Sequence, residues 1–331
     1  MEMQTEFSRD ALTIDAEATT GRIAESLREI VYQRLRRRGA VVGLSGGIDS
    51  SVTAALCARA FGKDRVVGLF MPEDDSSGDS LRLGQELARA LGIASIVEDI
   101  GPTLRALGCY QRRDDAVRKV IPEYGEGWKC KIVLPDLVNS SAYALYSVVA
   151  QSPDGETRRI RLNSEAYLGI VAATNFKQRT RKMLEYYHAD RLYYAVAGTP
   201  NRLEYAQGFF VKNGDGAADF KPIAHLYKSQ VVQLGKHLGV PEEILLRPPT
   251  TDTYSLEQSQ EEFYFSLPLA TMDLCLHAKN HGIPPAVVGQ ATGLSVEQVD
   301  RVFAMIDSKL STTRYLHLGP QLVEKVDEVV V

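Results

Sequence analysis

The sequence predicts an α/β fold, a doubly wound parallel sheet with helices on both faces, followed by a helical C-terminal segment. Over residues 40–100, short apolar runs typical of buried strands alternate with stretches of helical periodicity, and the links between them are short. A glycine-rich turn at residues 45–51 joins the first of these strands directly to a helix. Such sheets bind their ligands at this end of the strands.

The individual elements follow from the same patterns. Residues 1–20 are polar, and we expect a flexible N-terminus there. Residues 21–38 carry apolar side chains on one helical face and end in a basic run. From residue 248 onward the pattern becomes helical, and Ser295 with Gln298 is typical of a capping box. Further strands are expected at 41–44, 66–71, 93–97 and 193–197, and further helices at 52–61, 79–91, 164–192, 228–238, 286–293 and 295–307.

Residues 105–165 interrupt this alternation and are interpreted as an atypical insertion. A turn-forming run at residues 152–156 separates residues 143–150 from 158–162, which predicts a β-hairpin. Around the insertion, residues 21–250 are expected to form one nucleotide-binding domain. The helices of residues 251–331 are expected to complete that same domain.

Composition narrows the class of protein. The 331 residues are 44% hydrophobic and 24% charged, which is ordinary for a globular protein, and the net charge of −4 argues against nucleic-acid binding. No apolar run approaches the roughly 20 residues of a membrane span, and the polar N-terminus is no signal peptide. The four cysteines are widely spaced and are expected to be reduced thiols. We therefore expect a cytoplasmic protein that binds neither nucleic acid nor membrane.

The run Ser-Gly-Gly-Ile-Asp-Ser-Ser at residues 45–51 has the features of a phosphate-binding loop. Its glycines let backbone N–H groups approach an anion, its serines add donors, and the following helix adds a partial positive charge. It lacks the lysine of the Walker motif, and Asp49 would repel a bare phosphate, so we interpret Asp49 as a Mg²⁺ ligand. The alternative is an ordinary Gly-Gly turn. The expected pyrophosphate-binding residues are Ser45, Gly46, Gly47, Ser50 and Ser51.

Four further groups of polar residues stand out. Residues 173–183 contain Arg179 and Arg181, which lie about 200° apart on a helix and so cannot both hold one small anion. Lys228 opens a helix, where a lysine opposes the helix dipole, so we expect it to face an anion. Lys228 belongs to one group with residues 247–252, and the other two groups are Gly198–Glu204 after a predicted strand and the glycine-rich run 208–219.

In this order, the five motifs resemble those of the NAD synthetase family, which belongs to the N-type ATP pyrophosphatases and has a Rossmann-like sheet. The matching stretches are SGGIDSS, TNFKQRTRKM, GTPNRLEYAQGFFVKNGDGAAD, LYK and PPTTD. The resemblance implies that the nicotinate carboxylate of deamido-NAD attacks the α-phosphate of ATP and releases pyrophosphate. Ammonia then displaces AMP from the acyl-adenylate to give NAD. It also implies a magnesium-dependent, homodimeric ligase.

The resemblance also assigns roles to single residues. Asp49 and Glu204 match Mg²⁺ ligands, and Lys228 matches a catalytic phosphate contact. Asp215 matches an acid at the position of ammonia, where a carboxylate can accept a proton. Besides the loop, the residues that match ATP contacts are Thr199, Lys228 and Thr250; those that match substrate contacts are Asn175, Arg179, Asp215 and Asp219.

Two departures leave alternatives open. The chain has Pro200-Asn201 where the family commonly has Asp-His, and Thr251–Tyr254 replaces a more usual Ala-Asp-Leu. The first alternative is a related amide ligase that adenylates another carboxylic acid, fed by ammonia or by a separate glutaminase. A tRNA-modifying sulfur transferase is disfavoured because the cysteines are unpaired in sequence, and a non-catalytic nucleotide sensor is the last alternative.

Overall fold

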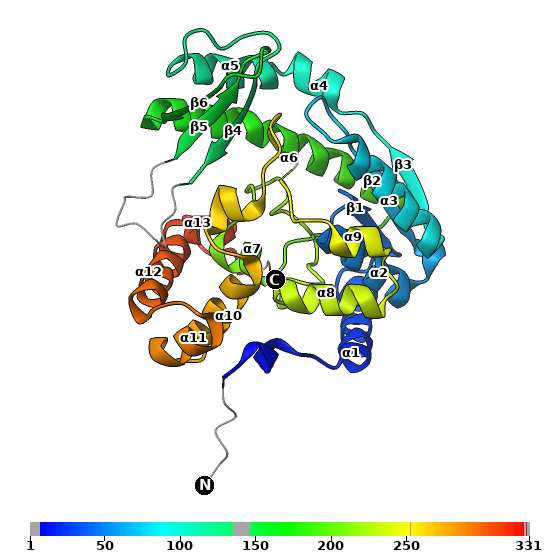
Figure 1. The fold of residues 1–331 in the computed structure, drawn as a ribbon. Helices are drawn as coiled ribbons and strands as arrows, with labels where there is room; N and C mark the ends of the chain where they lie inside the picture. Colours follow the sequence, from blue (N-terminus) through cyan, green and yellow to red (C-terminus); the bar gives the residue numbers. More distant parts are fainter. Residues whose placement is uncertain (1–6, 135–145, 252, 328, 330–331) are drawn as a thin grey trace.

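A four-stranded parallel sheet positions the phosphate-binding loop in the computed structural model, which describes residues 7–134, 146–251, 253–327 and 329 (Figure 1). The strand order is β3-β2-β1-β7, so β2 and β3 extend the sheet to one side of β1 and β7 to the other. Val42 of β1 lies opposite Gly68 of β2 and Ala197 of β7. The predicted parallel, doubly wound sheet is confirmed. The strands are β1 Ala40–Gly43, β2 Val66–Phe70, β3 Ala94–Val97 and β7 Ala195–Ala197.

Helices cover both faces of this sheet, as predicted. Because side chains alternate along a strand, Val42 packs into one apolar cluster and Val41 into another on the opposite face. The first cluster includes residues of α1, α2, α3 and α8, and the second those of α4, α5 and the long helix α6. These helices are α1 Ala16–Arg28, α2 Ile48–Phe61, α3 Gly78–Leu91, α4 Gly101–Ala106, α5 Cys109–Arg118, α6 Ser164–Leu192 and α8 Lys228–His237.

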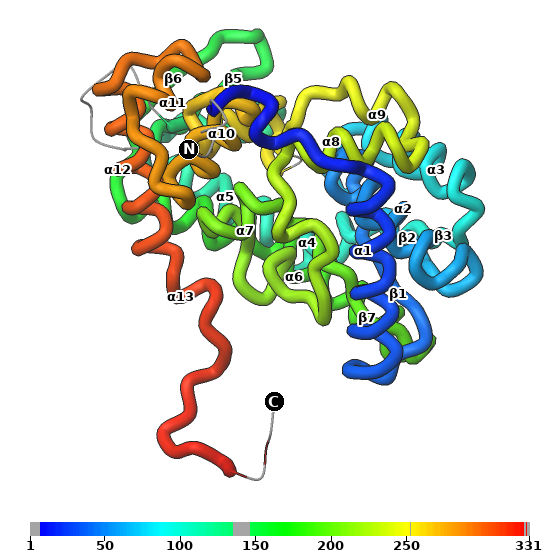
Figure 2. The backbone as a smooth tube through the Cα atoms, turned by 90° about the horizontal axis from the view of Figure 1, so that it is seen from below, coloured from blue at the N-terminus to red at the C-terminus, as the bar shows by residue number. Residues whose placement is uncertain are grey.

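The N-terminal segment differs from the expectation. Helix α1 begins at Ala16, capped by Asp15, and a π-helical turn then continues to Arg34, so the predicted range 21–38 was wrong at both ends. The stretch expected to be flexible contains a 3₁₀-helix at Arg9–Leu12. Leu12 is buried in the C-terminal apolar cluster, and its carbonyl accepts a hydrogen bond from Gln233 of α8. Figure 2 shows this segment crossing beside α10 and α8. Residues 1–6 lie outside the described part.

The insertion folds as a three-stranded antiparallel sheet in the order β4-β5-β6. The predicted hairpin is confirmed as β5 Ser147–Gln151 and β6 Thr157–Arg161, closed by a hydrogen bond from Ser152 N–H to Glu156 C=O. The third strand, β4 Lys129–Val133, was not predicted. Its apolar face packs with residues of α5 and the start of α6. Residues 135–145, which include part of the expected hairpin, lie outside the described part.

The C-terminal helices form a second apolar core against α7 Arg202–Gln207. The capping box of Ser295 and Gln298 is confirmed at the start of α12. Helix does not begin at residue 248, however: residues 248–251 and 253–259 contain no helix, and those up to Tyr254 reach the cavity at the carboxyl edge of the parallel sheet. The remaining elements are α9 Glu242–Leu246, a π-helical turn at Glu261–Phe265, α10 Leu269–Asn280, α11 Pro285–Thr292, α12 Val296–Thr312 and α13 Arg314–His317.

All four cysteines are free thiols buried in the protein, as the sequence predicted. Among the described residues, the structure contains no helix with the length and apolar character that crossing a membrane requires.

Candidate active site

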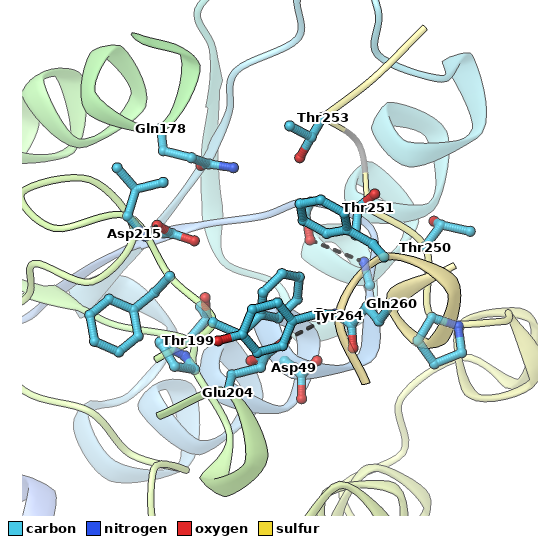
Figure 3. A pocket seen from close by; sticks show the side chains of 18 of the residues that line it. Asp49, Gln178, Thr199, Glu204, Asp215, Thr250, Thr251, Thr253, Gln260 and Tyr264 are labelled. Carbon is cyan, nitrogen blue, oxygen red and sulfur yellow. Dashed lines mark hydrogen bonds between the residues drawn. The ribbon is translucent and has the colours of Figure 1, made fainter. Parts of the chain in front are cut away.

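A cavity of about 1000 Å³ opens at the carboxyl edge of the parallel sheet. Its size is at the upper end for small-molecule sites. One wall is the phosphate-binding loop, a second is α6, and a third is formed by residues 199–215. Residues 248–251, 253 and 254 lie across from them (Figure 3). The inserted sheet and α12 also contribute, through Tyr146 and Lys309 among others. Segments far apart in the sequence therefore meet around one space.

The phosphate-binding loop is held open by its own backbone and hydroxyl groups. Gly46 has a positive φ of 73°, and a Cβ there would overlap the carbonyl oxygen of Ser80. Ser50 and Ser51 Oγ each donate to the carbonyl of Gly47, at 3.0 and 2.8 Å. Of the five expected pyrophosphate-binding residues, Ser45, Gly47 and Ser50 line the cavity and Gly46 and Ser51 do not. The latter two shape the turn instead.

Two carboxylates and a lysine meet beside this loop. Lys228 donates a hydrogen bond to Asp49 Oδ2, and Asn201 Nδ2 donates to Asp49 Oδ1 at 3.1 Å. Glu204 accepts from Asn201 N–H at 3.1 Å and from Gln260 Nε2 at 2.9 Å. Figure 3 shows Asp49 and Glu204 next to each other. Burial, and then the charge of Asp49, raise the pKa of Glu204 to about 8. The two carboxylates that the sequence paired across the sheet are therefore brought together.

Lys228 is fixed at the first turn of α8 by a carboxylate from another helix. Asp273 of α10 accepts hydrogen bonds from the N–H groups of Lys228 and Ser229, at 3.2 and 2.7 Å. Its negative charge offsets the unfavourable position of a lysine at a helix start. Burial raises the pKa of Asp273 to about 6. The expectation that Lys228 faces an anion is met by the carboxylate of Asp49.

Helix α6 supplies one wall through Asn175, Gln178, Arg179 and Arg181. Arg179 Nε donates to the carbonyl of Lys212, and Arg181 Nε to that of Met71, each at 3.3 Å. The two arginines were expected to point to opposite sides of the helix. They do reach different partners, but the cavity curves around α6 far enough to include both.

The other predicted residues divide into two groups. Thr199, Asp215 and Thr250 line the cavity. Asp215 Oδ1 accepts from Val211 N–H at 2.7 Å, and burial raises the pKa of its carboxyl group. Asp219 does not line the cavity: its Oδ2 accepts from Val196 N–H at 2.7 Å, next to the end of the sheet. The structure therefore does not bring Asp219 to the same space as Asp215.

Several cavity contacts were missed by sequence reasoning. Lys177 of α6 is buried and bonded to Glu73, to Asp75 and to the carbonyl of Thr253, at 3.0, 2.6 and 2.8 Å. It ties the loop after β2 to the backbone at Thr253. Gln260 reaches Glu204 because it lies beside Pro249, with Gln260 N–H bonded to Pro249 C=O. Such contacts join residues far apart in the chain, and the local spacing of residues does not predict them.

Aromatic side chains line part of the cavity. Tyr146 and Tyr167 are stacked with ring centroids 4.7 Å apart, and Phe263 lies 6.4 Å from Tyr146. Phe209 stacks on Tyr264 at 4.6 Å, and the Tyr264 hydroxyl donates to the carbonyl of Gln207, on the helix that carries Glu204. All five rings line the cavity. The same space therefore offers charged groups at the loop and planar apolar surfaces at these rings.

Comparison with known proteins gives a consistent result. The family model described as NAD synthase matches residues 19–121 and 155–312, leaving out most of the inserted sheet. The NH3-dependent NAD+ synthetase of Rhizobium meliloti is 61% identical over 98% of this chain and 96% of its own length, and that of Rhizobium rhizogenes is 59% identical over 98% of each. The structure of the Campylobacter jejuni NH3-dependent NAD synthetase covers 94% of this chain and 100% of its own, with a TM-score of 0.61 at 22% identity, which indicates a shared fold.

Proposed function

This chain belongs to the NAD synthase family, and we propose that it catalyses the ATP- and ammonia-dependent synthesis of NAD from deamido-NAD. The nicotinate carboxylate attacks the α-phosphate of ATP, which releases pyrophosphate and leaves an acyl-adenylate. Ammonia then attacks the acyl carbon, and AMP leaves. The observation that carries this proposal is the similarity to NH3-dependent NAD+ synthetases over almost the whole chain, together with one cavity that gathers residues from all five motifs.

The residues beside the loop fit a Mg²⁺ ion. Asp49 and Glu204 lie close enough that the charge of Asp49 helps to raise the pKa of Glu204, and a divalent cation between them would relieve that repulsion. No group of three or more metal-ligating side chains occurs among the described residues. This suits Mg²⁺, which commonly takes one or two carboxylates and completes its shell with water and substrate phosphates. When bound, the ion supplies positive charge to the triphosphate. Asp49 and Glu204 are the residues that would hold it.

The phosphate groups of ATP would lie against the loop and the start of α2. The backbone N–H groups there, with Ser45 and Ser50, present donors to the pyrophosphate that leaves. Lys228 is paired with Asp49 here. Once that carboxylate takes a cation, the lysine can turn to the phosphates and absorb the charge that develops during transfer. Thr199 and Thr250 line the same cavity.

The acid substrate would enter from the side of α6. Asn175 and Arg179 line this wall and can hold polar groups of the dinucleotide, and the planar guanidinium suits a carboxylate or phosphate. Asp215 lies toward the sheet, where ammonia would reach the acyl carbon, and its raised pKa suits it to accept a proton. Asp219 supports this site indirectly, since it is bonded to the backbone of β7 rather than directed into the cavity.

The proposal also covers the oligomeric state of the protein and its location in the cell. We expect a homodimer that buries roughly 2,000 Å² or more, as obligate interfaces do, acting in the cytoplasm with Mg²⁺. Size measurement by light scattering checks this, and a stable monomer with full activity would contradict it. A separate glutaminase is an additional proposed source of ammonia.

A reconstituted assay tests the function. Purified protein, MgATP, ammonium and deamido-NAD should give NAD, AMP and pyrophosphate in equal amounts. Nicotinate mononucleotide and a panel of other carboxylic acids serve as competing substrates. Asp49→Asn should remove turnover. Release of pyrophosphate with another acid but not with deamido-NAD would refute the proposed substrate and favour a related amide ligase.

A further inference from the structure

A small chamber lies directly beside the main cavity, between α6 and the ends of β1 and β7. Its volume is about 30 Å³, above the roughly 10–15 Å³ that a cavity needs to hold a water molecule. It is lined by Gly43, Lys182, Glu185, Ala197, Thr199 and Asp215, four of which also line the main cavity. The chamber therefore has room for one molecule the size of water or ammonia, next to the proposed position of the acyl carbon.

Two of the lining side chains, Lys182 and Glu185, were given no role by the sequence. Both are buried: the side chain of Lys182 is 7% exposed and that of Glu185 is 9% exposed. Lys182 Nζ donates to Glu185 Oε2 at 2.5 Å. The other oxygen, Oε1, faces the end of β1, where a Cβ on Gly43 would lie only 2.9 Å away. The ion pair thus fixes one carboxylate oxygen and leaves the other directed toward the sheet edge.

The chemistry of the nitrogen step calls for two proton acceptors. At neutral pH, free ammonia is present almost entirely as ammonium. Ammonium plus an acyl-adenylate gives the amide, AMP and two protons: one leaves before the nitrogen lone pair can attack, and one leaves after the C–N bond forms and the C–O bond to AMP breaks. Asp215 alone accounts for one of these protons. A second carboxylate in the same chamber accounts for the other.

We propose that this chamber binds the ammonium ion and that Glu185, together with Asp215, accepts its two protons during amide formation. The proposal rests on the proposed function of the main cavity. Ammonium donates to the two carboxylates; one takes a proton and ammonia attacks; the second takes a proton from the nitrogen as AMP departs. Lys182 acts as a positioning residue that holds Glu185 in place.

The surroundings of the chamber support proton acceptance over simple capture of a cation. Burial raises the pKa of Glu185 and of Asp215, which makes both better proton acceptors than exposed carboxylates. Lys182 and Lys221 lie close enough to act on Asp215 and on each other electrostatically. A cation that stayed charged would meet these two ammonium groups, whereas neutral ammonia would not.

The test compares the two half-reactions in Glu185→Gln. Exchange of labelled pyrophosphate into ATP, dependent on deamido-NAD, measures adenylation; NAD formation at varied ammonium measures the nitrogen step. We expect kcat/KM for ammonium to fall about 10²-fold, the lower end of a general base's contribution, while exchange falls far less. Hydroxylamine, which is largely neutral at neutral pH and has one proton fewer to lose, should recover part of the lost amide-forming rate. Glu165→Gln, at the exposed start of the same helix, is the matched control and should change neither rate.

The possible results distinguish a failure of the role proposed for Glu185 from a failure of the proposed function. An unchanged kcat/KM for ammonium, or an equal loss in both half-reactions, would overturn the role of Glu185. If the single variant fails to fold because Lys182 is left unpaired, the double variant Lys182→Met/Glu185→Gln removes both charges and should show the same selective loss. If the unaltered protein exchanges pyrophosphate only with another acid, the proposed substrate fails, and the ammonium measurement is made with that acid instead.

Discussion

Replacing Lys228 with methionine tests the charge balance on which the candidate active site depends. The Lys228 side chain is 7% exposed and its partner Asp49 16%, so the pair is largely removed from water. Burial alone would lower the pKa of Lys228, but the carboxylates of Asp49 and Glu204 more than offset it and the pKa is raised. The ionised lysine therefore stabilises the fold without substrate. Lys228→Met keeps most of the volume and removes only the charge.

The expected cost follows from what the variant leaves behind. Removing one partner of a buried ion pair destabilises a protein by about 3–5 kcal/mol. The lower end applies here, because Glu204, with a pKa of about 8, is mostly protonated at neutral pH and so adds little repulsion to the charge of Asp49. We expect a loss of about 3 kcal/mol, which lowers the urea midpoint by roughly 1 M, because a chain of this size has a urea m-value of about 3 kcal/mol/M or more.

Urea unfolding with EDTA and with millimolar Mg²⁺ provides the assay. Mg²⁺ should stabilise Lys228→Met more than the unaltered protein, because a bound ligand stabilises by mass action and the lysine no longer competes for Asp49. Lys236→Met, at the exposed last turn of the same helix, should cost no more than about 0.5 kcal/mol and should not change the response to Mg²⁺. The reasoning is refuted if Lys228→Met is as stable as the unaltered protein, or if Mg²⁺ stabilises the two equally.

Two further changes probe other parts of the cavity. Gly46→Ala should weaken ATP binding by at least tenfold and lower the melting temperature. The positive φ costs about 1–2 kcal/mol for alanine, and the added Cβ would overlap Ser80. ATP titration followed by fluorescence measures the affinity, and calorimetry measures the melting temperature. Lys309→Met should raise thermal stability at pH 7, because burial lowers the pKa of Lys309 to about 7. Since the unfolded value is about 10.4, the unfolded chain binds more protons between these values, and the unaltered protein gains stability as pH rises. The advantage of the variant should therefore shrink between pH 7 and pH 10; a constant difference in melting temperature would contradict the lowered pKa.

The sequence predicted those parts of the fold that local patterns determine. The strand–loop–helix at residues 40–61 and the helix α8 agree closely with expectation, because each buries apolar residues between clear turn signals. The helix α6 also has the expected bounds, although it buries Lys177, Lys182 and Glu185 as well as apolar residues. The N-terminal segment was misjudged because its order comes from a distant contact, the burial of Leu12 among the C-terminal helices. Strand β4 was missed for a similar reason: its residues carry charge on one face and become a strand by pairing with β5.

For the site, the sequence predicted which residues take part but not which of them contact each other. The order of the motifs was enough to predict that Asp49, Glu204 and Lys228 belong to one site. Each lies at the carboxyl edge of the sheet or at a helix start that faces it. Spacing could not show that Lys228 binds Asp49 when substrate is absent, nor that Glu185 and Lys182 form a buried pair behind them. Yet both pairs obey one rule: a carboxylate kept out of water at this edge has a lysine beside it. In one pair the lysine can be exchanged for Mg²⁺ and a phosphate, and in the other it stays. That difference separates a site that must bind anions from a chamber that must accept protons.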